Sequence, residues 1–236
     1  MNTMTTPKIQ IYTADTSALH DAALYEKAYA SVSETRRRKV ERLRSGQDKR
    51  LSLGAGYLLL CACKDFGISY ENAQIVTDEF SKPRFADLPL FFSLSHSGER
   101  AMCIMAEAPV GCDVEQRRPV KPALAGRFFS EGENRALDSC AAPEAREALF
   151  FKLWTLKESF LKCTGQGLRL PLSAFSVSVG QSGIHLTQSV DDAQYQLFAE
   201  DFGDGYQYAW CIRDAENSLQ LSESTALWCS VDLQRI

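Results

Sequence analysis

Two acidic side chains lie close together in the middle of the sequence. In the segment Val110-Gly111-Cys112-Asp113-Val114-Glu115, the carboxylates of Asp113 and Glu115 are two residues apart. The apolar neighbours predict a strand at 111–114, in which both carboxylates point to one face and Val114 points to the core. Neighbouring carboxylates repel each other unless a cation joins them, and Mg²⁺ takes one or two carboxylates together with phosphate oxygens. The pair indicates a divalent-metal site, with an exposed polar strand end as the alternative.

A third carboxylate lies on a helix that the sequence predicts over residues 143–163. The buried stripe of this helix is defined by four apolar residues at helical spacing, Leu149, Leu153, Leu156 and Phe160. At about 100° per residue, Trp154, Glu158 and Lys162 share the opposite face. That face carries further large apolar side chains, so it is more typical of a cleft wall than of a surface in open water. The alternative is a surface Glu–Lys pair that stabilises the helix only slightly.

Ser95 and His96 lie at a predicted turn, in the segment Phe92-Ser93-Leu94-Ser95-His96-Ser97-Gly98. A lone histidine is usually structural, but one between two serines and just before the carboxylates is well placed to contact a phosphate. No G-x-S-x-G motif surrounds Ser95, which argues against a Ser–His nucleophile. The sequence has no Walker motif, and Gly54-Ala55-Gly56 lies within a predicted helix and lacks the third glycine of a dinucleotide fingerprint. ATP- and NAD-dependent activities are therefore disfavoured.

A basic strip interrupts an otherwise acidic chain. The formal net charge is −4, yet residues 36–50 contain eight basic residues and two acidic ones. A protein that binds nucleic acid in bulk is usually basic overall, so the strip fits a small polyanion better. The segment Ser31-Val32-Ser33-Glu34 has the pattern of a capping box, which predicts that the strip is helical. A solvated helix face is the alternative interpretation.

The composition is that of an ordinary globular protein. Of the 236 residues, 45% are hydrophobic and 24% are charged. No stretch reaches the ~18 consecutive apolar residues of a membrane helix, and residues 1–10 lack the apolar centre of a signal peptide. Eight cysteines without a metal-ligand spacing indicate reduced thiols, most of them buried as small hydrophobes. We therefore expect a cytoplasmic protein.

The predicted elements follow a similar order in two parts of the chain. Each part has a long helix that ends in a lysine shortly before a glycine, Lys64 before Gly67 and Lys162 before Gly165, and short strands follow. This order indicates an α+β fold of two similar halves, residues 1–110 and 111–236, with a ligand cleft between them. Helices are predicted over 17–30, 33–43, 48–65, 122–128, 131–140 and 143–163. Strands are predicted over 9–12, 74–77, 92–95, 102–106, 111–114, 175–179, 183–187, 194–198, 206–212 and 225–231.

Five motifs together resemble the 4′-phosphopantetheinyl transferases, in particular the larger, pseudo-dimeric type that activates peptide and polyketide synthetases. The motifs occur in the order and spacing of that family and cover most of the chain. They are Arg50 at the start of the long helix, Ser81-Lys82-Pro83, Phe92 to Gly98, Gly111 to Glu115, and Trp154-Thr155-Leu156-Lys157-Glu158-Ser159-Phe160-Leu161-Lys162. Ser81 replaces a usual glycine and Cys112 a usual valine or isoleucine, and both replacements are small.

The resemblance implies two α+β halves related by a pseudo-twofold axis, with coenzyme A and Mg²⁺ in the cleft between them. By position, Asp113, Glu115 and Glu158 correspond to the metal site. Lys162 resembles the lysine that contacts the phosphates of coenzyme A. Glu158 is also the candidate base, and Lys162 and His96 would help to neutralise the charge of the diphosphate.

The same resemblance implies contacts to the nucleotide end of coenzyme A. Ser95 and His96 match the segment that binds its phosphates, and Lys82-Pro83 matches the segment beside the adenine nucleotide. Arg50 resembles the arginine near the 3′-phosphate, with residues 36–39 as less certain neighbours.

The implied reaction moves phosphopantetheine from coenzyme A to a serine of an acyl, peptidyl or aryl carrier protein and releases 3′,5′-ADP. Such carriers are typically acidic, and the basic residues after the metal motif could meet them or serve only solubility: Arg117, Arg118, Lys121 and Arg127. A cleft made within one chain leads us to expect a monomer. The alternatives are a Mg²⁺-dependent phosphohydrolase that acts on a nucleotide-like diphosphate and a non-catalytic nucleotide-binding module.

Overall fold

The computed structural model describes residues 7–79, 82–120, 122–214, 221–222 and 225–236. Its helices are α1 (Ala22–Ser31), α2 (Glu34–Arg42), α3 (Gly46–Asp65), α4 (Pro122–Phe128), α5 (Glu131–Asp138) and α6 (Pro143–Thr164). Its strands are β1 (Ile9–Asp15), β2 (Ile75–Thr77), β3 (Pro83–Phe85), β4 (Phe91–Ser97), β5 (Arg100–Ala106), β6 (Val110–Gln116), β7 (Ser176–Gly180), β8 (Gly183–Thr187), β9 (Gln194–Glu200), β10 (Tyr206–Asp214) and β11 (Leu227–Ser230).

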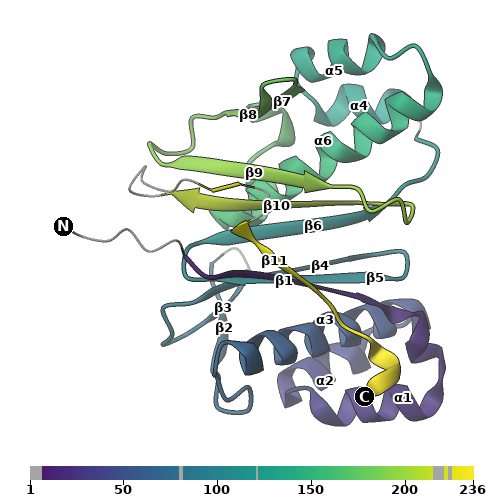
Figure 1. The fold of residues 1–236 in the computed structure, drawn as a ribbon, viewed down its shortest axis with the longest axis vertical. Helices are drawn as coiled ribbons and strands as arrows, with labels where there is room; N and C mark the ends of the chain where they lie inside the picture. The colour runs from purple at the N-terminus through teal and green to yellow at the C-terminus, as the bar shows by residue number, and fades with distance from the viewer. Residues whose placement is uncertain (1–6, 80–81, 121, 215–220, 223–224) are drawn as a thin grey trace.

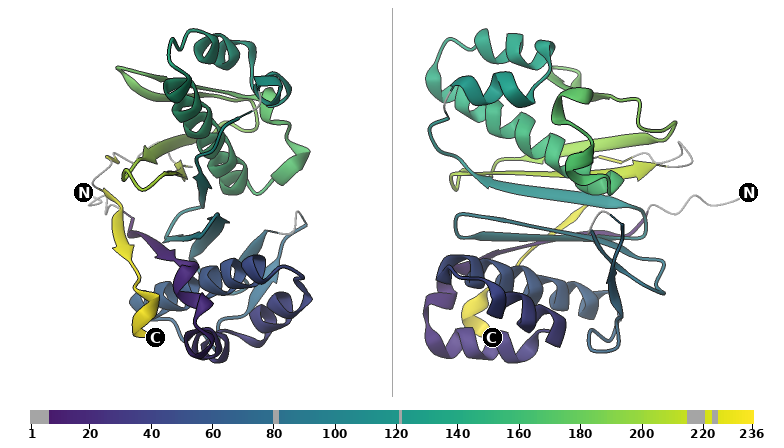
Figure 2. Two further views of the ribbon diagram at one scale, coloured as in Figure 1. Left: turned by 90° about the vertical axis from the view of Figure 1, so that its right-hand side faces the viewer. Right: turned by 180° about the vertical axis from the view of Figure 1, so that it is seen from behind.

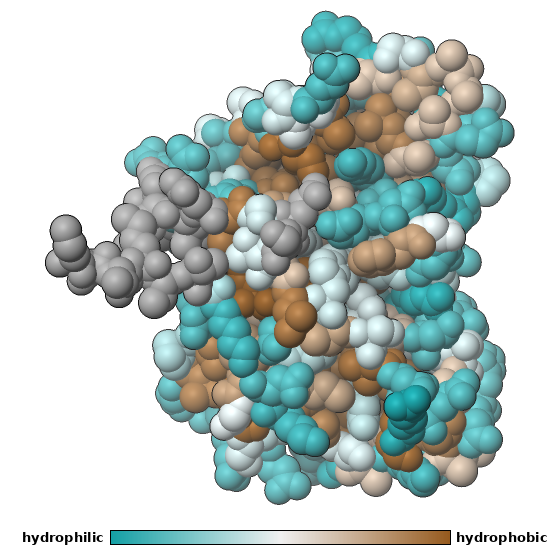
Figure 3. All heavy atoms as spheres, in the orientation of Figure 1, coloured by the Kyte–Doolittle hydropathy of each residue, from teal (hydrophilic) through white to brown (hydrophobic). Residues whose placement is uncertain are grey.

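Two sheets lie against each other in the middle of the molecule, and helices cover their outer sides (Figures 1 and 2). Helices α1, α2 and α3 lie beside one sheet, and α4, α5 and α6 lie beside the other. On the face seen in Figure 3, hydrophobic and hydrophilic residues are interspersed, as on most protein surfaces. The arrangement confirms the predicted α+β class, whereas the pseudo-twofold relation and the boundary between residues 110 and 111 stay predictions.

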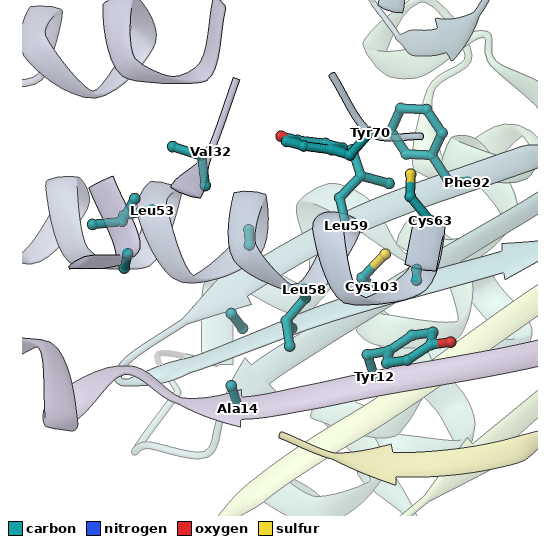
Figure 4. Packing of buried hydrophobic residues seen from close by; sticks show 14 of the residues in the cluster. Tyr12, Ala14, Val32, Leu53, Leu58, Leu59, Cys63, Tyr70, Phe92 and Cys103 are labelled. Atoms are coloured by element: carbon teal, nitrogen blue, oxygen red, sulfur yellow. The ribbon is translucent and has the colours of Figure 1, made fainter. Parts of the chain in front are cut away.

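Strand β1 lies inside the first sheet, whose order among the described residues is β11-β1-β5-β4. It is antiparallel to β5, with Ile11 opposite Ile104. Tyr12 and Ala14 lie on the side of the sheet that α3 covers (Figure 4). Ile9 and Ile11 point the other way and pack with residues of the second sheet. Because alternate side chains enter two different cores, β1 is apolar on both faces.

The second sheet has the order β6-β10-β9 among the described residues, and α6 packs on it. Helix α6 approaches β6 very closely at Gly111. A Cβ atom there would overlap the Ser159 carbonyl oxygen and the Cys163 amide nitrogen, and it would lie 2.9 Å from the carbonyl carbon of Lys162. Gly111 therefore lets the last turns of α6 lie directly on the strand that carries Asp113.

Serine side chains connect the two sheets where β4 runs beside β6. The hydroxyl oxygens of Ser93, Ser95 and Ser97 accept hydrogen bonds from alternate backbone N–H groups of β6. The donors are Cys112 at 3.2 Å, Val114 at 3.3 Å and Gln116 at 3.2 Å. Serine is small and carries an acceptor, so it takes the place that a backbone carbonyl would have in a continuous sheet. We call this set the serine ladder.

The sequence predicts most helices and strands correctly but misplaces some local features. The capping residue of α2 is Ser33, whose hydroxyl accepts from the N–H of Arg36. Ser31 instead ends α1 and donates to the Lys27 carbonyl, so the capping box predicted from Ser31 is wrong. The helix predicted over 17–30 is divided at Asp21, which caps α1. Strand β3 has no counterpart in the prediction, because a three-residue strand beginning with proline carries little sequence signal.

The eight cysteines are free thiols in the structure, and most of them are buried, as the sequence predicts. Burial raises the pKa of Cys63 to about 12 and that of Cys112 to about 11, which keeps both thiols protonated and unreactive. None of the helices in the described ranges has the length and apolar character needed to cross a membrane.

Lys157 forms a fully buried ion pair that ties α6 to α5 and β7. Its ammonium donates to Glu133 Oε1 at 2.5 Å and to the Phe175 carbonyl oxygen at 2.7 Å. The same Glu133 oxygen accepts the N–H of Val177 at 2.7 Å. Burial lowers the pKa of Lys157, and Glu133 opposes that effect.

We expect Lys157→Met to lower the free energy of unfolding by about 3 kcal/mol, because it leaves the Glu133 carboxylate buried without its cation. Urea unfolding monitored by circular dichroism measures the loss. The double variant Lys157→Met/Glu133→Gln should recover part of it, since no buried charge then remains. Equal losses in the single and double variants would contradict this explanation.

Candidate active site

A cavity of about 570 Å³ lies where α2, β4, β6 and α6 meet. It brings together most of the residues that the sequence singles out, although they come from distant parts of the chain. Those that line it are Lys82, Pro83, Ser95, His96, Asp113, Glu115, Trp154, Glu158 and Lys162. The predicted strand alternation places Asp113 and Glu115 on one side, and the predicted helical face places Glu158 and Lys162 opposite them.

Asp113 is the most buried carboxylate of the cavity, with 3% of the residue exposed. Its Oδ1 atom accepts hydrogen bonds from Ser95 Oγ and from Lys162 Nζ, both at 2.7 Å. Its Oδ2 atom is buried and has no hydrogen-bond partner among the described residues. A buried carboxylate oxygen without a donor is costly, and a cation would satisfy it.

Lys162 joins α6 to both sheets. Besides the ion pair with Asp113, its ammonium donates to Ser95 Oγ at 2.9 Å. Burial alone would lower its pKa, but the charge and hydrogen bond of Asp113, together with weaker contributions that include Glu158, outweigh burial and raise the pKa above the ordinary value. Lys162 therefore stays charged at neutral pH and supplies a fixed positive charge at the base of the cavity.

The other two carboxylates, Glu115 and Glu158, are half-buried, and their surroundings disfavour the charged form of each. Burial raises the pKa of Glu115, and repulsion from Asp113 adds to the rise. Burial also raises the pKa of Glu158 to about 7; Asp113 and Glu115 contribute to this rise, whereas Lys162 opposes it. Asp113 thus disfavours the charged form of both glutamates, the effect expected where several carboxylates face one site.

The described residues contain no group of three or more His, Cys, Asp or Glu side chains arranged to hold a metal ion. The donor chemistry still fits Mg²⁺, because this ion prefers carboxylate oxygens and completes its shell with waters and substrate phosphate oxygens. The unpartnered Oδ2 of Asp113 is the observation that speaks for such an ion.

Cationic side chains form another wall of the cavity. Arg36 and Lys39 from α2 line it together with Lys82 and His96. His96 is exposed, yet the cavity walls reduce its contact with water and lower the pKa of its imidazole, and the charges of Lys162, Lys39 and Arg36 lower it further. A neutral imidazole among fixed cations can donate a hydrogen bond to an anion without needing a proton from solvent.

Arg36 is held in place by a glycine on the neighbouring helix. A Cβ atom on Gly56 would lie 2.7 Å from Arg36 Cγ, so only glycine leaves room for the arginine stem on α3. The guanidinium reaches the carbonyl and hydroxyl oxygens of Ser52 at 3.5 Å. At Gly54 a Cβ atom would lie 2.5 Å from Thr16 Cγ2, so close packing explains both Gly54 and Gly56, and neither belongs to a nucleotide-binding loop.

Arg50 does not occur among the described residues that line the cavity. It lies one turn into α3, with its guanidinium near Gly46. The sequence alone could not show that Arg36 lines the cavity and Arg50 does not, because the directions of these side chains depend on how α2 and α3 are placed relative to each other. The sequence analysis also did not identify the hydrogen bonds of Ser97 to β6 or the packing of Arg36 on Gly56. For Ser97 a signal was available, because serine occurs at alternate positions of residues 93–97.

The chain is similar in sequence to known proteins. A family model described as the 4′-phosphopantetheinyl transferase superfamily matches residues 109–211. The 4′-phosphopantetheinyl transferase Sfp of Bacillus subtilis (strain 168) is 32% identical over 191 residues, which cover 79% of this chain and 84% of that protein. The 4′-phosphopantetheinyl transferase psf-1 of Bacillus pumilus is 35% identical over 187 residues, which cover 77% and 79%.

Among solved structures, a holo-(acyl-carrier-protein) synthase of Bacillus anthracis in complex with CoA (3′,5′-ADP) is similar to 46% of this chain and 97% of that one, with a TM-score of 0.41 and 15% identity. The sequence relatives define the class: the chain belongs to the 4′-phosphopantetheinyl transferase superfamily. It is therefore an enzyme that transfers phosphopantetheine, as the motifs predict.

Proposed function

We propose that this enzyme transfers 4′-phosphopantetheine from coenzyme A to a serine hydroxyl of an apo acyl, peptidyl or aryl carrier protein. In this reaction the serine oxygen forms a bond to the β-phosphorus of coenzyme A. The bond from that phosphorus to the bridging oxygen breaks, and 3′,5′-ADP leaves with the electron pair. The observation that carries the proposal is one cavity that combines three carboxylates with Lys162 and a cationic wall.

Asp113, Glu115 and Glu158 would hold a Mg²⁺ ion in this cavity. When bound, the ion supplies positive charge that neutralises the diphosphate. Lys162 and His96 would assist from the protein side, Lys162 as a permanent cation and His96 as a neutral hydrogen-bond donor. The unpartnered Oδ2 atom of Asp113 supports this assignment.

Glu158 is the proposed acceptor of the serine proton. Without a metal ion the pKa of Glu158 is about 7, which makes it a stronger proton acceptor than an ordinary glutamate, and a bound Mg²⁺ would lower this value. Direct contact with the serine and contact through one water are both compatible with this role. Glu158 therefore has two proposed functions, as base and as metal ligand.

The cationic wall is the proposed binding site of the nucleotide end of coenzyme A. Ser95 and His96 would contact its phosphates, Lys82 and Pro83 would lie beside the adenine nucleotide, and an arginine would meet the 3′-phosphate. Two arginines are candidates for that last contact, Arg50 by resemblance and Arg36 by its position in the cavity.

The two arginines can be compared directly. We expect Arg36→Ala to raise the KM for coenzyme A by about tenfold, which corresponds to the loss of one charge-assisted contact. Arg50→Ala, the same substitution on the neighbouring helix, should change the KM by less than about threefold. Steady-state kinetics with a fixed carrier concentration measure both values. A larger increase in KM for Arg50→Ala than for Arg36→Ala would indicate that Arg50, and not Arg36, contacts the 3′-phosphate.

A basic surface beside the cavity is the proposed docking site of an acidic carrier. Arg118 and Arg127 are exposed. Arg117 forms an ion pair with Asp201 at 2.5 Å, so we do not include Arg117 among the residues that contact the carrier. Lys121 lies outside the described residues. Residues of both predicted halves line the cavity, so a second copy is not needed to complete it, and we propose a monomeric enzyme.

The decisive experiment mixes the protein with coenzyme A, Mg²⁺ and an apo carrier protein and measures the carrier by intact-mass spectrometry. The proposal predicts that the carrier gains the mass of one phosphopantetheine. It also predicts that EDTA prevents the gain and that added Mg²⁺ restores it. Cleavage of coenzyme A without modification of a carrier would indicate the phosphohydrolase, and binding of coenzyme A without any product would indicate a non-catalytic nucleotide-binding module.

A further inference from the structure

The serine ladder does more than join the two sheets. We propose that Ser97 is a positioning residue that holds the carboxylate of Glu115 in place for a divalent ion. The inference rests on the proposed function, because it assumes that Glu115 is a metal ligand. It concerns a residue that does not line the cavity itself and is not among the expected ligand contacts.

Ser97 and Ser95 make the same pair of hydrogen bonds, one step apart on β4. Ser95 accepts the N–H of Val114 and donates its own proton to Asp113 Oδ1 at 2.7 Å. Ser97 accepts the N–H of Gln116 and donates to Glu115 Oε2 at 2.7 Å. Each hydroxyl thus binds the backbone of one β6 residue and the carboxylate of the residue before it.

This repeat fixes both carboxylates relative to the backbone of β6. A serine hydroxyl has a single proton, and the accepted N–H restricts the direction in which that proton can point. Asp113 has a second restraint from Lys162. Glu115 has a longer side chain with more freedom to rotate, and the bond from Ser97 restricts it most directly.

The first step of the ladder provides an internal control. Ser93 accepts the N–H of Cys112 at 3.2 Å, as the other two serines accept theirs. The residue before Cys112 is Gly111, which has no side chain, so the Ser93 step of the ladder holds no carboxylate. Ser93 lines the cavity, but its hydroxyl is not bonded to a carboxylate. Removing it therefore tests the ladder without a restraint on a metal ligand, whereas removing the Ser97 hydroxyl tests the ladder together with the restraint on Glu115.

The test measures Mn²⁺ binding by the loss of the free-ion electron paramagnetic resonance signal, with coenzyme A present and no carrier, so that no turnover occurs. We expect Ser97→Ala to weaken Mn²⁺ binding by about tenfold, as is typical when a partner of a metal ligand is removed. Ser97→Thr, which keeps the hydroxyl, should stay within about threefold of the unmodified protein. Ser93→Ala should lower the melting temperature about as much as Ser97→Ala while leaving the Mn²⁺ affinity unchanged.

Two results would overturn the inference about Ser97 and leave the proposed function intact. They are unchanged Mn²⁺ affinity in Ser97→Ala and an equal loss of Mn²⁺ affinity in Ser93→Ala. If Ser97→Ala does not fold, Ser97→Cys replaces it, since a thiol keeps the size but donates only weakly. An unmodified protein that binds no Mn²⁺ overturns both this inference and the metal role of the proposed function. The mass measurement on the carrier, which uses the unmodified protein, reports on the transfer reaction independently.

Discussion

Glu158→Gln is expected to lower the kcat of phosphopantetheine transfer by about 100-fold or more, the effect of losing a general base. The substitution keeps the size of the side chain but removes both its charge and its capacity to accept a proton. If Glu158 is also a metal ligand, the requirement for Mg²⁺ should rise in the same variant. The rate of mass gain on the carrier at saturating coenzyme A and carrier measures the effect.

Glu144→Gln is the matched control for this variant. Glu144 lies in the first turn of the same helix and is exposed. The control should keep the rate within about twofold, because an exposed charge far from the cavity is screened by solvent. A normal rate in Glu158→Gln would show that another group accepts the proton and would remove Glu158 from the mechanism.

Gly111→Ala is expected to lower the free energy of unfolding by more than about 4 kcal/mol, a loss reached only by severe packing defects. The added Cβ atom would meet backbone atoms of Ser159, Lys162 and Cys163, none of which can rotate away. Relief requires α6 to move off β6, which opens the core beneath it and separates Lys162 from Asp113. The fall in melting temperature, read by differential scanning calorimetry, should therefore be accompanied by loss of activity at temperatures where the variant is still folded.

Gly132→Ala serves as the control for the added methyl group. Gly132 lies in α5, and a Cβ atom there would have no heavy atom within 4 Å. Alanine favours a helix over glycine by about 1 kcal/mol, so this variant should be as stable as the unmodified protein or slightly more stable. Comparable losses at both glycines would show that the close approach of α6 to β6 is not the cause.

The elements with strong periodicity could be predicted from the sequence. Helix α6 was predicted nearly to its bounds because its apolar stripe is regular and Gly165 ends it. The face shared by Trp154, Glu158 and Lys162 followed from the same periodicity, and the alternation of β6 placed Asp113 and Glu115 together. These patterns are local, so one stretch of sequence contains all the information that they need.

Features that depend on contacts between distant segments could not be predicted. Strand β11 pairs with β1, which lies far from it in the sequence, and the sequence of neither strand indicates which strand it pairs with. The place of Arg36 in the cavity depends on a glycine of the next helix, and the role of Ser97 depends on a strand that lies in another sheet. Such features require the packed structure, because the sequence records the residue types but not which of them meet.

The parallel pairing of β1 with β11 has a consequence for biosynthesis. Residue pairs such as Gln10 with Leu227 and Thr13 with Ser230 can form only after residue 230 has left the ribosome, long after β1 has been synthesised. At 5–20 residues per second, the edge of β1 waits roughly 10–40 s for its partner. During that interval the edge of β1 that β11 covers in the folded protein has no partner strand, so this part of the first sheet is completed last.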